Sequence, residues 1–593
     1  MAVSKKAREQ HEPFVGPTTI LSLTLASVSP QKMSSHRSIS SFLPRFRYAS
    51  TIAFGRRVAE LDAKAIRELP THELLQRLGY IRQDHAGLVH WLPLGLRTLR
   101  NIETIIGKRM TECGSLEVAL SSISGSELWK KTGRWGNEEL FKLKGDFCLV
   151  PTCEEEITRL VNDAVSSYKE LPLVVHQITR KYRDEKRPRA GLLRGREFLM
   201  KDAYSFDSDE AGGLATFERL NSAYRAIFTD LRVPFVAANA DSGDIGGDLS
   251  TEWHYRHSSG EDVLFECSGC GSVSNSEKAT SVPAETEPAA RRAKAAYFTT
   301  QSRDKLVVMY YPEDRVLNPQ FARSEIPDLD LSLRDEAAVL EIFEDEDAFL
   351  SKWIVRIMDP RVTRETDLPD LKVPYHRNAM STFLDVPLVE AREGEVCGSC
   401  FEGTLSASRA IEVGHTFYLD EKYSSALGAG FTDESGAFTP FKMGCYGIGV
   451  SRLVAAIAEV LRDSQGLRWP ATVAPYKVGI VPGSGADEEV ITKAKTQLEE
   501  AGFSVLEDSR PKVSVGKRLR ENKCLGLPLQ IIIGKLYPLV EIEVRGQRFG
   551  TTSEEAQRSG KWNWEVVSSD VGEKHLVHVD DLVEVVGVLL KDL

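Results

Sequence analysis

Two short segments combine an arginine with groups that can bind a nucleotide. Arg183 and Glu185 close one extended stretch, and Arg196 and Phe198 open the next. A guanidinium offers a planar fork of donors that fits a phosphate, and a phenyl ring can stack on a base. The pattern Arg-x-Glu is common by chance, so these residues alone predict only a candidate nucleotide site. The alternative for each arginine is a surface ion pair, which contributes at most about 1 kcal/mol.

A glycine-rich element that ends in arginine lies further along the chain. Residues 444–452 read Gly-Cys-Tyr-Gly-Ile-Gly-Val-Ser-Arg and run into a helix predicted over Leu453–Leu461. Glycines let the backbone approach a ligand closely, and the start of the helix presents Arg452. No Gly-Lys-Ser/Thr follows, so this is not a Walker loop, and no distant acid completes a dinucleotide-binding motif. The element therefore indicates an anion or nucleotide site outside those two classes.

Four of the nine cysteines form two C-x-x-C pairs, Cys267/Cys270 and Cys397/Cys400. The other five are scattered singly, which argues against a disulfide framework. Each pair has zinc-knuckle spacing, and four thiolates could hold a structural Zn²⁺ ion. The long separation between the pairs exceeds that of an ordinary zinc ribbon, so free thiols and a disulfide remain open alternatives.

The elements that must position these groups follow from the periodicity of apolar residues. The predicted elements are helices over Leu96–Met110 and Leu214–Leu231, an extended segment over Leu116–Ile123, and strands over Val174–Arg183 and Glu197–Tyr204. An arginine-rich loop, Lys186–Arg196, joins the two strands. The stripes of apolar residues on the helices are expected to face the core.

The chain changes character after Pro475, where short strands and helices alternate. The predicted elements are strands over Tyr476–Val481, Phe503–Leu506, Leu529–Ile533 and Val540–Val544, with helices over Asp487–Ala501 and Ser514–Lys523. This βαβαβ order predicts a small separate α/β domain. A stretch between the two C-x-x-C pairs, residues 271–396, also has a domain's length and is acidic around Glu344, Asp345, Glu346 and Asp347.

Bulk composition sets wide limits. The chain has 593 residues, 42% of them hydrophobic and 27% charged, which predicts a soluble protein of several domains. No apolar run is long enough to span a membrane, so we expect no membrane contact. The net charge of −11 neither indicates nor excludes nucleic acid, since a large protein that binds nucleic acid needs only a local basic surface.

The first 57 residues differ from the rest. Between Met33 and Arg57 there are five arginines and six serines but no acidic residue. This composition is typical of a mitochondrial transit peptide, and a disordered basic tail is the alternative. We expect a protein of the mitochondrial matrix, with a cytoplasmic form from an alternative start as a second hypothesis.

Several ordered motifs together resemble class II aminoacyl-tRNA synthetases, specifically prolyl-tRNA synthetases of the bacterial and mitochondrial type. The motifs are Pro151–Glu155, Lys181–Glu185, Arg196–Phe206, Asp244–Gly247, Ile411–Phe417 and Gly444–Arg452. The resemblance extends over roughly residues 61–593. It implies an α/β multidomain chain with an antiparallel-sheet catalytic core, an inserted domain and a C-terminal α/β anticodon-binding domain. The implied parts are residues 1–57 (leader), 58–270 and 397–474 (catalytic core), 271–396 (a reduced editing-like insertion) and 475–593 (anticodon-binding domain).

The resemblance also implies the reaction and the roles of the residues. Proline would be joined to tRNA(Pro) through a prolyl-adenylate, with ATP as substrate and Mg²⁺ bridging the phosphates. The catalytic residues would be Arg183 on the α-phosphate, Glu185 on the adenine amino group and Arg452 on the γ-phosphate. Phe198 would stack on adenine, and Arg196 would complete the ATP site. Because the substrate carboxylate itself attacks, no protein nucleophile is needed, and catalysis is positioning plus neutralisation of phosphate charge.

Proline specificity is assigned by the same resemblance to six residues: Thr152, Glu154, Glu252, Trp253, His415 and Phe417. A secondary ammonium needs an acceptor carboxylate and a pyrrolidine ring needs a tight apolar wall, which Glu154 and Phe417 can supply. A packed core histidine is the alternative for His415. In the tail, Asp508, Arg510 and Lys535 are the candidates for reading anticodon bases, with solvated surface as their alternative.

Three departures from the family pattern stand out. Ser121 and Ser122 occupy the stretch where relatives carry a proline in the dimer-forming motif, although we still expect a homodimer. Asp420 and Glu421 replace the usual Gly-Thr, and two carboxylates near a triphosphate have no explanation in the sequence. The insertion lacks the family's glycine-rich portion, which predicts weak or absent editing of mischarged alanyl-tRNA.

Two rival hypotheses remain. One is a class II ligase for another amino acid, such as threonine or glycine, and the motifs around Thr152 and His415 argue against it. The other is an inactive synthetase-like accessory protein that binds nucleic acid. Such relics typically lose the phosphate-binding arginines, whereas Arg183 and Arg452 are both present.

Overall fold

The computed structural model describes residues 63–593 except for 244, 248, 285–286, 345–351, 376 and 570–571. The predicted leader, Asp244 of one motif and the acidic residues 345–347 therefore lie outside the described residues. Among the helices that the structure describes, none is both long and apolar enough to cross a membrane.

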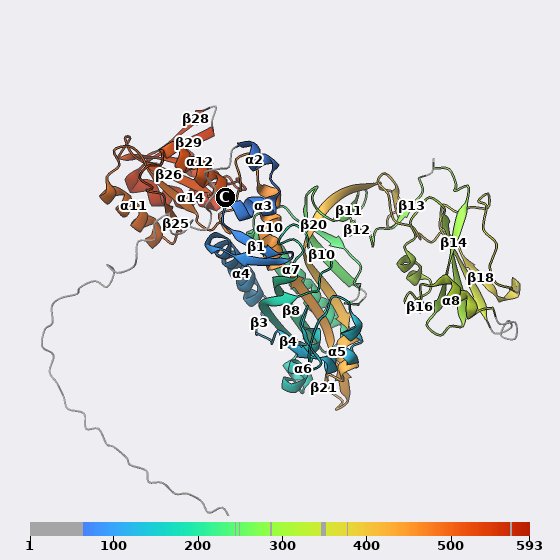
Figure 1. The fold of residues 1–593 in the computed structure, drawn as a ribbon. Helices are drawn as coiled ribbons and strands as arrows, with labels where there is room; N and C mark the ends of the chain where they lie inside the picture. The colour runs from blue at the N-terminus through green and yellow to red at the C-terminus, as the bar shows by residue number, and fades with distance from the viewer. Residues whose placement is uncertain are drawn as a thin grey trace, which may run out of the picture. The chain divides into compact units, whose positions relative to one another are not determined.

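A nine-stranded sheet organises the catalytic region (Figure 1). Its order is β10 (Leu249–Arg256), β9 (Val236–Asn239), β12 (Val273–Asn275), β11 (Asp262–Cys267), β20 (Leu405–Asp420), β23 (Lys442–Ile448), β8 (Glu197–Asp207), β7 (Leu173–Tyr182) and β3 (Leu116–Glu117). Neighbouring strands are antiparallel apart from β12 with β9 and β3 with β7, and β10 also pairs with β20. The predicted strand pair around the arginine-rich loop is confirmed as β7 and β8, whereas the predicted extended segment after the first helix shortens to β3.

One face of this sheet is covered by three helices, α4 (Pro93–Glu112), α7 (Glu210–Asp230) and α10 (Val450–Leu461). Their apolar stripes pack on inward residues of β8, β10, β20 and β23, as the periodicity of the sequence predicts. Asp209 caps α7 by accepting the N–H of Gly212, and Arg109 of α4 pairs with Asp230 at 2.7 Å. The smaller helices and hairpin nearby are α2 (Ala63–Glu68), α3 (Thr71–Arg77), β1 (Ile81–His85) and β2 (Leu88–Trp91).

The opposite face carries a second apolar cluster that includes Phe206, Phe417 and Tyr423. Further members of the cluster come from β6 (Phe147–Leu149), β21 (Gly430–Thr432), α5 (Ser126–Lys131), α6 (Glu154–Ala164) and α9 (Lys422–Leu427). Three short strands lie beside these elements: β4 (Ile123–Gly125) and β5 (Phe141–Leu143) pair with β6, and β22 (Phe438–Pro440) pairs with β21. Successive residues of β8 therefore serve different faces: Ala203 packs with the three helices and Tyr204 with this cluster.

The inserted segment builds its own five-stranded sheet. The order is β16 (Leu329–Asp330), β14 (Ala293–Thr300), β15 (Lys305–Pro312), β17 (Trp353–Met358) and β18 (Met380–Phe383), with helix α8 (Glu336–Glu341). At its base, β13 (Ser281–Val282) pairs with β19 (Val396–Cys397). The sequence places the start of the insertion at residue 271, but β12 belongs to the catalytic sheet, so the structure moves that start beyond Asn275.

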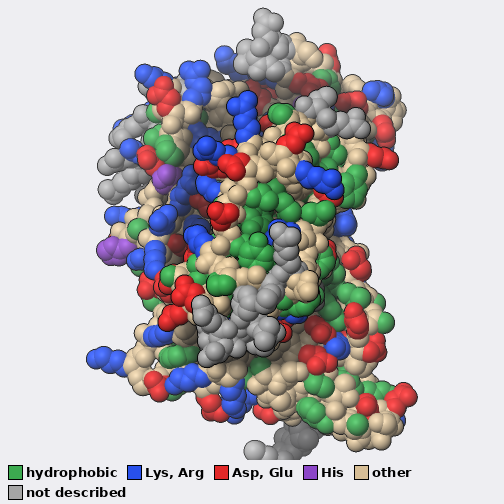
Figure 2. All heavy atoms as spheres, turned by 90° about the vertical axis from the view of Figure 1, so that its right-hand side faces the viewer, with side chains coloured by type: hydrophobic (Ala, Val, Ile, Leu, Met, Phe, Trp, Pro, Cys, Tyr) green, Lys and Arg blue, Asp and Glu red, His purple; other side chains and the backbone are tan. Residues whose placement is uncertain are grey.

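Charged and apolar side chains are unevenly spread over the surface. Figure 2 shows apolar side chains gathered near the middle of one face, with acidic and basic side chains around them. Several large apolar residues of the inserted segment are exposed, namely Val316, Trp353, Tyr375 and Leu384.

The C-terminal region is a six-stranded mixed sheet with helices. The order is β25 (Val505–Glu507), β24 (Val478–Pro482), β26 (Leu529–Ile533), β27 (Leu539–Val544), β29 (Gly572–His578) and β28 (Trp564–Ser569). The helices are α11 (Glu488–Glu500), α12 (Val515–Leu525), α13 (Thr552–Arg558) and α14 (Leu582–Asp592). The predicted βαβαβ order is confirmed, because β24 lies parallel to both β25 and β26. The last two strands and last two helices were not predicted from the sequence.

Candidate active site

A cavity of about 340 Å³ opens between the end of β7, the start of β8, the C-terminal half of β20 and the start of α10. The predicted site residues that line it are Thr152, Glu154, Arg183, Glu185, Phe198, His415, Phe417 and Arg452. Three others, Arg196, Glu252 and Trp253, do not line it. The fold thus brings together residues that are almost 300 positions apart in the sequence.

A bulge in β20 brings Glu412, which the sequence did not single out, to the cavity together with two of these side chains. In the pairing with β10, Gly414 faces Trp253 but Glu412 faces His254, so β20 carries one extra residue at this point. The extra residue reverses the alternation of faces, which lets Glu412, His415 and Phe417 share one side of the strand. In a regular strand, the side chains of Glu412 and His415 would point to opposite faces of the sheet.

Arg183 lies just beyond the end of β7. Its guanidinium lies 5.2 Å from the centre of the Phe198 ring. Within the part of the chain that the structure describes, its side chain forms no ion pair and no hydrogen bond. Loss of water around the group, together with the positive charge of Arg452, lowers the pKa of Arg183. A cation in this setting is poised for an anionic ligand.

Glu185 is 6% exposed, and the loop around it is held by hydrogen bonds. One carboxylate oxygen accepts the N–H of Arg187 at 2.9 Å, and the other accepts from the Arg194 side chain at 2.5 Å. Burial works to raise the pKa of Glu185, but these bonds outweigh it and the pKa is lowered. The carboxylate is therefore ionised at the cavity wall.

Arg196 supports this loop from outside the cavity. Its side chain donates to the carbonyl of Glu185 at 3.0 Å, and its N–H bonds the carbonyl of Gly87 at 2.9 Å. Gly87 has φ +78°, and a Cβ there would lie 2.9 Å from the Arg196 nitrogen, so only glycine fits this approach. The structure gives Arg196 a positioning contact where the sequence predicts an ATP contact.

Arg452 belongs to the first turn of α10. Its side chain donates to the carbonyl of Leu193 at 2.9 Å and to the Glu412 carboxylate at 2.9 Å. The neighbouring Ser451 hydroxyl accepts the N–H of Leu199 at 2.8 Å, which ties the helix start to β8. Arg452 and Arg183 thus approach the same cavity from different elements, one already paired and the other not.

The far wall of the cavity is acidic. Glu154 is fully buried, and its carboxylate accepts from the Thr152 hydroxyl at 2.7 Å, the Cys445 thiol at 3.1 Å and Arg134 at 3.0 Å. Burial works to raise the pKa of Glu154, yet the charge of Arg134 and these hydrogen bonds bring it below the usual range. An ionised acceptor therefore faces the cavity. The sequence analysis missed Arg134, because no motif marks it.

Behind this wall lies a buried polar chain that the sequence analysis also missed. Lys181 pairs with Asp202 at 2.7 Å, and both side chains are at most 1% exposed. The Tyr204 hydroxyl donates to Asp202 at 2.8 Å and accepts the N–H of Cys153 at 2.9 Å. The chain holds the segment between Thr152 and Glu154 in place from the rear, and Asp202 itself reaches the cavity.

His415 stacks on Phe417 with ring centres 3.8 Å apart. Its ring nitrogen lies 3.6 Å from Glu252 and 3.8 Å from Glu412. Burial lowers the pKa of His415 to about 4, so the ring is neutral near pH 7. Burial and the charge of Glu412 raise the pKa of Glu252 to about 8, and Asn275 donates to this carboxyl group at 2.7 Å. Glu252 thus lies outside the cavity lining and contacts His415, which belongs to it.

Trp253 has a different place from the one predicted. Its side chain is fully buried and stacks on Phe228 at 5.4 Å, within the apolar cluster under the three helices. Since alternate residues of a strand face opposite sides, Glu252 and Trp253 cannot both point toward one site. The sequence prediction placed both near proline, and the structure brings only Glu252 close.

The acidic pair Asp420 and Glu421 has a partner that the sequence did not reveal. The Lys442 ammonium lies 2.7 Å from Asp420 and 2.9 Å from Glu421. Hydrogen bonds to these carboxylates, Asp420 first, raise the pKa of Lys442. The chain supplies its own counter-charge, so the pair needs no metal ion to be tolerated.

The tail candidates are arranged unequally. Arg510 makes two bonds to the buried Asp508 at 2.9 Å and one to Glu521 at 2.5 Å. Lys535 is exposed after β26. Asp508 therefore positions Arg510, and Lys535 stands in solvent.

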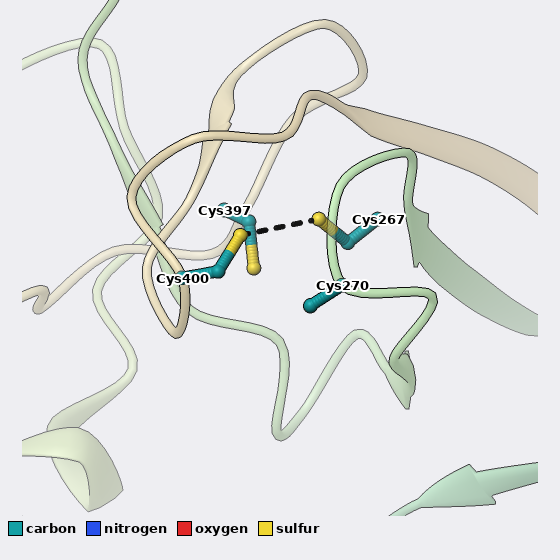
Figure 3. A group of neighbouring side chains, drawn as sticks. All are labelled: Cys267, Cys270, Cys397 and Cys400. Carbon is teal, nitrogen blue, oxygen red and sulfur yellow. Dashed lines mark hydrogen bonds between the residues drawn. The ribbon is translucent and has the colours of Figure 1, made fainter.

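The four paired cysteines converge at the base of the insertion (Figure 3). Their sulfur atoms all lie within 4.8 Å of one another, and Cys267 and Cys400 are 3.5 Å apart. They are outside the cavity, at the opposite end of β20 from His415 and Phe417.

Comparison with known families divides the chain into two parts. The family described as "tRNA synthetase class II core domain (G, H, P, S and T)" matches residues 140–461, and the family described as "Anticodon binding domain" matches residues 477–588. The first match contains the cavity, and the second contains the six-stranded sheet.

Curated relatives match over nearly their whole length. A cytoplasmic proline–tRNA ligase of Candida albicans is 44% identical over 582 residues, covering 93% of this chain and 100% of that protein. A probable mitochondrial proline–tRNA ligase of Saccharomyces cerevisiae is also 44% identical, covering 90% of this chain and 97% of that protein. A bacterial proline–tRNA ligase, from Moorella thermoacetica, is 37% identical and covers 81% and 92%.

The fold also matches solved structures. The prolyl-tRNA synthetase of Cryptosporidium parvum, complexed with L-proline and AMP, superposes with a TM-score of 0.53 at 14% identity. The match covers 89% of this chain and 78% of that chain. At this identity the likeness supports the fold alone.

Proposed function

This chain is an enzyme of the class II aminoacyl-tRNA synthetases, from the family of the proline–tRNA ligases, and from that premise we propose that it joins L-proline to tRNA(Pro) through a prolyl-adenylate, for mitochondrial translation. One observation carries the proposal most strongly. The same cavity holds a cation, Arg183, that has no ion-pair partner among the described residues and lies beside an aromatic ring, and an ionised carboxylate, Glu154, on the far wall. Such a cavity fits a ligand with an anionic phosphate, a flat base and an ammonium group.

In the first step, a carboxylate oxygen of proline attacks the α-phosphorus of ATP. A bond from carboxylate oxygen to phosphorus forms, the bond from phosphorus to the bridging oxygen breaks, and pyrophosphate leaves. Arg183 is proposed to neutralise the α-phosphate, and Arg452 the γ-phosphate. Phe198 is proposed to stack on adenine, while Glu185 accepts from its amino group with the lone pairs left over from its loop bonds. In-line positioning and charge neutralisation then supply the rate enhancement.

In the second step, a ribose hydroxyl oxygen of the tRNA forms an ester bond to the acyl carbon, and the bond from that carbon to the phosphate oxygen breaks. AMP leaves with the electron pair, and the hydroxyl proton passes to its phosphate. No side chain needs to become covalently attached. The tail sheet is proposed to hold the anticodon, with Arg510 and Lys535 as base or phosphate contacts. The match of residues 477–588 to an anticodon-binding family supports that role.

Mg²⁺ is expected to enter with ATP. It prefers oxygen ligands, and the cavity offers the carboxylates of Glu139 and Glu412 beside the arginines. The residues present therefore fit the ion, which when bound would add positive charge to the phosphates. The four thiols lie outside the cavity, so a Zn²⁺ ion held by them would have a structural role.

Proline selection is proposed to rest on Glu154 and on the stacked pair His415 and Phe417. Glu154 supplies an ionised acceptor for the secondary ammonium, and Thr152 fixes the orientation of its carboxylate. His415 is neutral and Phe417 is only 8% exposed, so together they form an uncharged wall for the ring. Glu252 contributes through its contact with His415, and Trp253 through packing.

Amino-acid-dependent exchange of pyrophosphate into ATP tests this function directly. A panel of amino acids is offered to the purified protein, and exchange with proline is expected. Exchange with threonine or glycine instead would overturn the specificity, and exchange with none of them would favour the accessory hypothesis.

The mitochondrial role rests on the leader composition and on the mitochondrial relative from Saccharomyces cerevisiae, while the relative from Candida albicans is cytoplasmic. Import of the full chain into isolated mitochondria, with loss of the leader, is the expected outcome. A fluorescent fusion that starts at Met33 and stays entirely in the cytosol would contradict it.

Two further proposals concern the insertion and assembly. The lost glycine-rich portion supports weak or absent hydrolysis of alanyl-tRNA, and efficient deacylation by the purified protein would overturn this. A homodimer is proposed from the family resemblance, despite Ser121 and Ser122. Its test is the mass in solution by light scattering, and a monomer at micromolar concentration would contradict it.

A further inference from the structure

The two C-x-x-C pairs meet in space although 133 positions separate Cys267 from Cys400. All four sulfur atoms lie within 4.8 Å of one another, and the closest two are 3.5 Å apart. A tetrahedral zinc ion with Zn–S bonds of about 2.3 Å needs sulfurs separated by about 3.8 Å. The observed spacing is thus that of a ligand set around one ion.

Hydrogen-bond donors surround the sulfur atoms. The N–H groups of Gly269, Ser399 and Gly403 point at the sulfurs of Cys267, Cys397 and Cys400, at 3.3, 3.4 and 3.5 Å. The Ser272 hydroxyl lies 3.0 Å from the Cys270 sulfur. Every sulfur therefore has a hydrogen-bonding neighbour in addition to the other sulfurs, as ligand atoms of a structural metal site commonly do.

The two loops approach so closely that only glycine fits between them. A Cβ on Gly403 would lie 2.3 Å from the Gly269 nitrogen and 2.4 Å from the Cys267 sulfur. The pair of glycines lets the second loop lie directly against the first, which brings Cys400 to Cys267. All four sulfurs converge here, whereas a disulfide would explain the approach of only two of them.

The cluster sits where the chain leaves the catalytic sheet and returns to it. Cys267 ends β11, Cys397 ends β19, and β20 begins at Leu405 opposite Cys267. A buried ionic cluster adjoins the same base. Glu395 accepts from Arg315 at 2.5 Å and lies 3.0 Å from Arg361, with all three side chains at most 9% exposed. The segment that leaves the nine-stranded sheet after β11 and the segment that returns to it at β20 are therefore held together at the base of the insertion.

We propose that Cys267, Cys270, Cys397 and Cys400 bind one Zn²⁺ ion that ties these two segments together at the base of the insertion. Four thiolates leave no open coordination position, so the ion is structural. This inference does not depend on the amino acid or tRNA used, and a chain with different specificity would bind the metal equally well.

The first experiment is metal analysis of the full chain, purified without chelator, by plasma mass spectrometry. The expected result is about one zinc per chain. The Cys270→Ser variant is expected to lose most of the zinc, and because Cys270 is exposed the substitution removes little packing. The matched control is Cys113→Ser, a half-buried thiol outside the cluster, which should retain the full zinc content.

A second measurement does not need any variant to fold. Replacement of zinc by Co²⁺ should give the visible d–d bands and thiolate charge-transfer bands of a tetrahedral four-sulfur site. Removal of the metal with a chelator should lower the thermal midpoint by roughly 5 °C, and added Zn²⁺ should restore it.

Counting reactive thiols separates the remaining outcomes. The chain has nine cysteines, and in the denatured, unreduced protein all nine should react with an alkylating agent. Seven reactive thiols would reveal a disulfide and overturn the proposal. Nine thiols together with no stoichiometric metal, or with iron in place of zinc, would overturn it as well.

Discussion

At one end of β20, the Arg183 guanidinium faces the cavity without an ion-pair partner among the residues that the structure describes. At the other end, four sulfurs converge, with hydrogen bonds from backbone N–H groups to three of them. The Arg183 guanidinium can bind an anionic ligand, whereas the four sulfurs form a ligand set for a cation. The two ends of the strand are about 50 Å apart, from its sixteen residues and the rise of about 3.3 Å per residue of an extended chain.

Because of this difference, substitutions at the two ends are expected to have different effects on activity and stability. The cavity contains pairs such as Arg452 with Glu412 that are already satisfied, and Arg183 stands apart from them. Removing Arg183 should therefore cost function and little stability, because no partner is left behind. Removing a group at the thiol end should cost stability and little chemistry.

The largest effect is expected for Arg183→Ala. Loss of the only cavity cation that lacks a described partner should lower proline-dependent pyrophosphate exchange by about 10²–10³-fold. The matched control is Arg180→Ala, on the same strand, whose side chain is 64% exposed and pairs with Glu197. It should change the rate less than about twofold. Nearly normal exchange by the Arg183 variant would contradict the proposed role of Arg183 in the reaction.

Glu154→Gln comes next. The substitution keeps the shape but removes the ionised acceptor, so KM for proline should rise by about 10²-fold, while KM for ATP changes little. Steady-state exchange at varied proline and ATP separates the two constants. Glu156→Gln, a neighbour that accepts from Trp129 outside the cavity, serves as control. A similar rise in both Michaelis constants would indicate general damage to the cavity.

Gly403→Ala tests the thiol end without removing a ligand. The added Cβ would push the Cys397–Cys400 loop away from Cys267, so zinc content should fall and stability should drop by about 2 kcal/mol. Exchange activity at 25 °C should stay within about threefold of the parent. The control is Gly394→Ala or Gly271→Ala, each with open space at the Cβ position but a positive φ, which reports backbone strain alone. Full zinc content in the Gly403 variant would refute the packing argument.

The smallest effect concerns pH. The pKa of Glu252 is raised to about 8 in the folded chain, above its ordinary value near 4.5. Between these values the folded state binds more protons than the unfolded state, so stability falls as pH rises from about 4.5 to 8. Glu252→Gln should flatten this decline and be more stable than the parent at pH 8 by on the order of 2 kcal/mol.

Thermal unfolding at pH 5, 6.5 and 8 measures this difference. Glu266→Gln, on the neighbouring strand β11 and paired with Arg256 at the surface, is the control and should leave the decline unchanged. Parallel curves for the parent and the Glu252 variant would show that this carboxyl group titrates normally.

The sequence predicted what lies along one stretch of chain and missed what depends on pairing between strands. Arg183 and Phe198 were found because a short motif carries each, and the βαβαβ tail because its apolar runs alternate. Arg134 and Asp202 were missed because their partners lie on other elements. Lys442 explains an acid pair that the sequence left unexplained, from a strand twenty-two positions away.

The bulge in β20 is another feature that no sequence pattern predicted. Strict alternation would have placed Glu412 and His415 on opposite faces, and only the register with β10 shows that they share one. For Glu252 and Trp253 the sequence suggested a shared site, but the structure places the two side chains on opposite faces of the strand.

The contact between Tyr80 and the tail has a consequence for synthesis on the ribosome. Tyr80 donates to the carbonyl of Leu525 at 2.7 Å and accepts from Trp469 at 2.9 Å. Leu525 and Leu527 belong to the same apolar cluster as the helices that cover the catalytic sheet. A nascent chain that has emerged only through the catalytic segments would still lack part of this core. The catalytic half should therefore reach its final stability only after the tail has left the exit tunnel, and until then it is a natural client for chaperones.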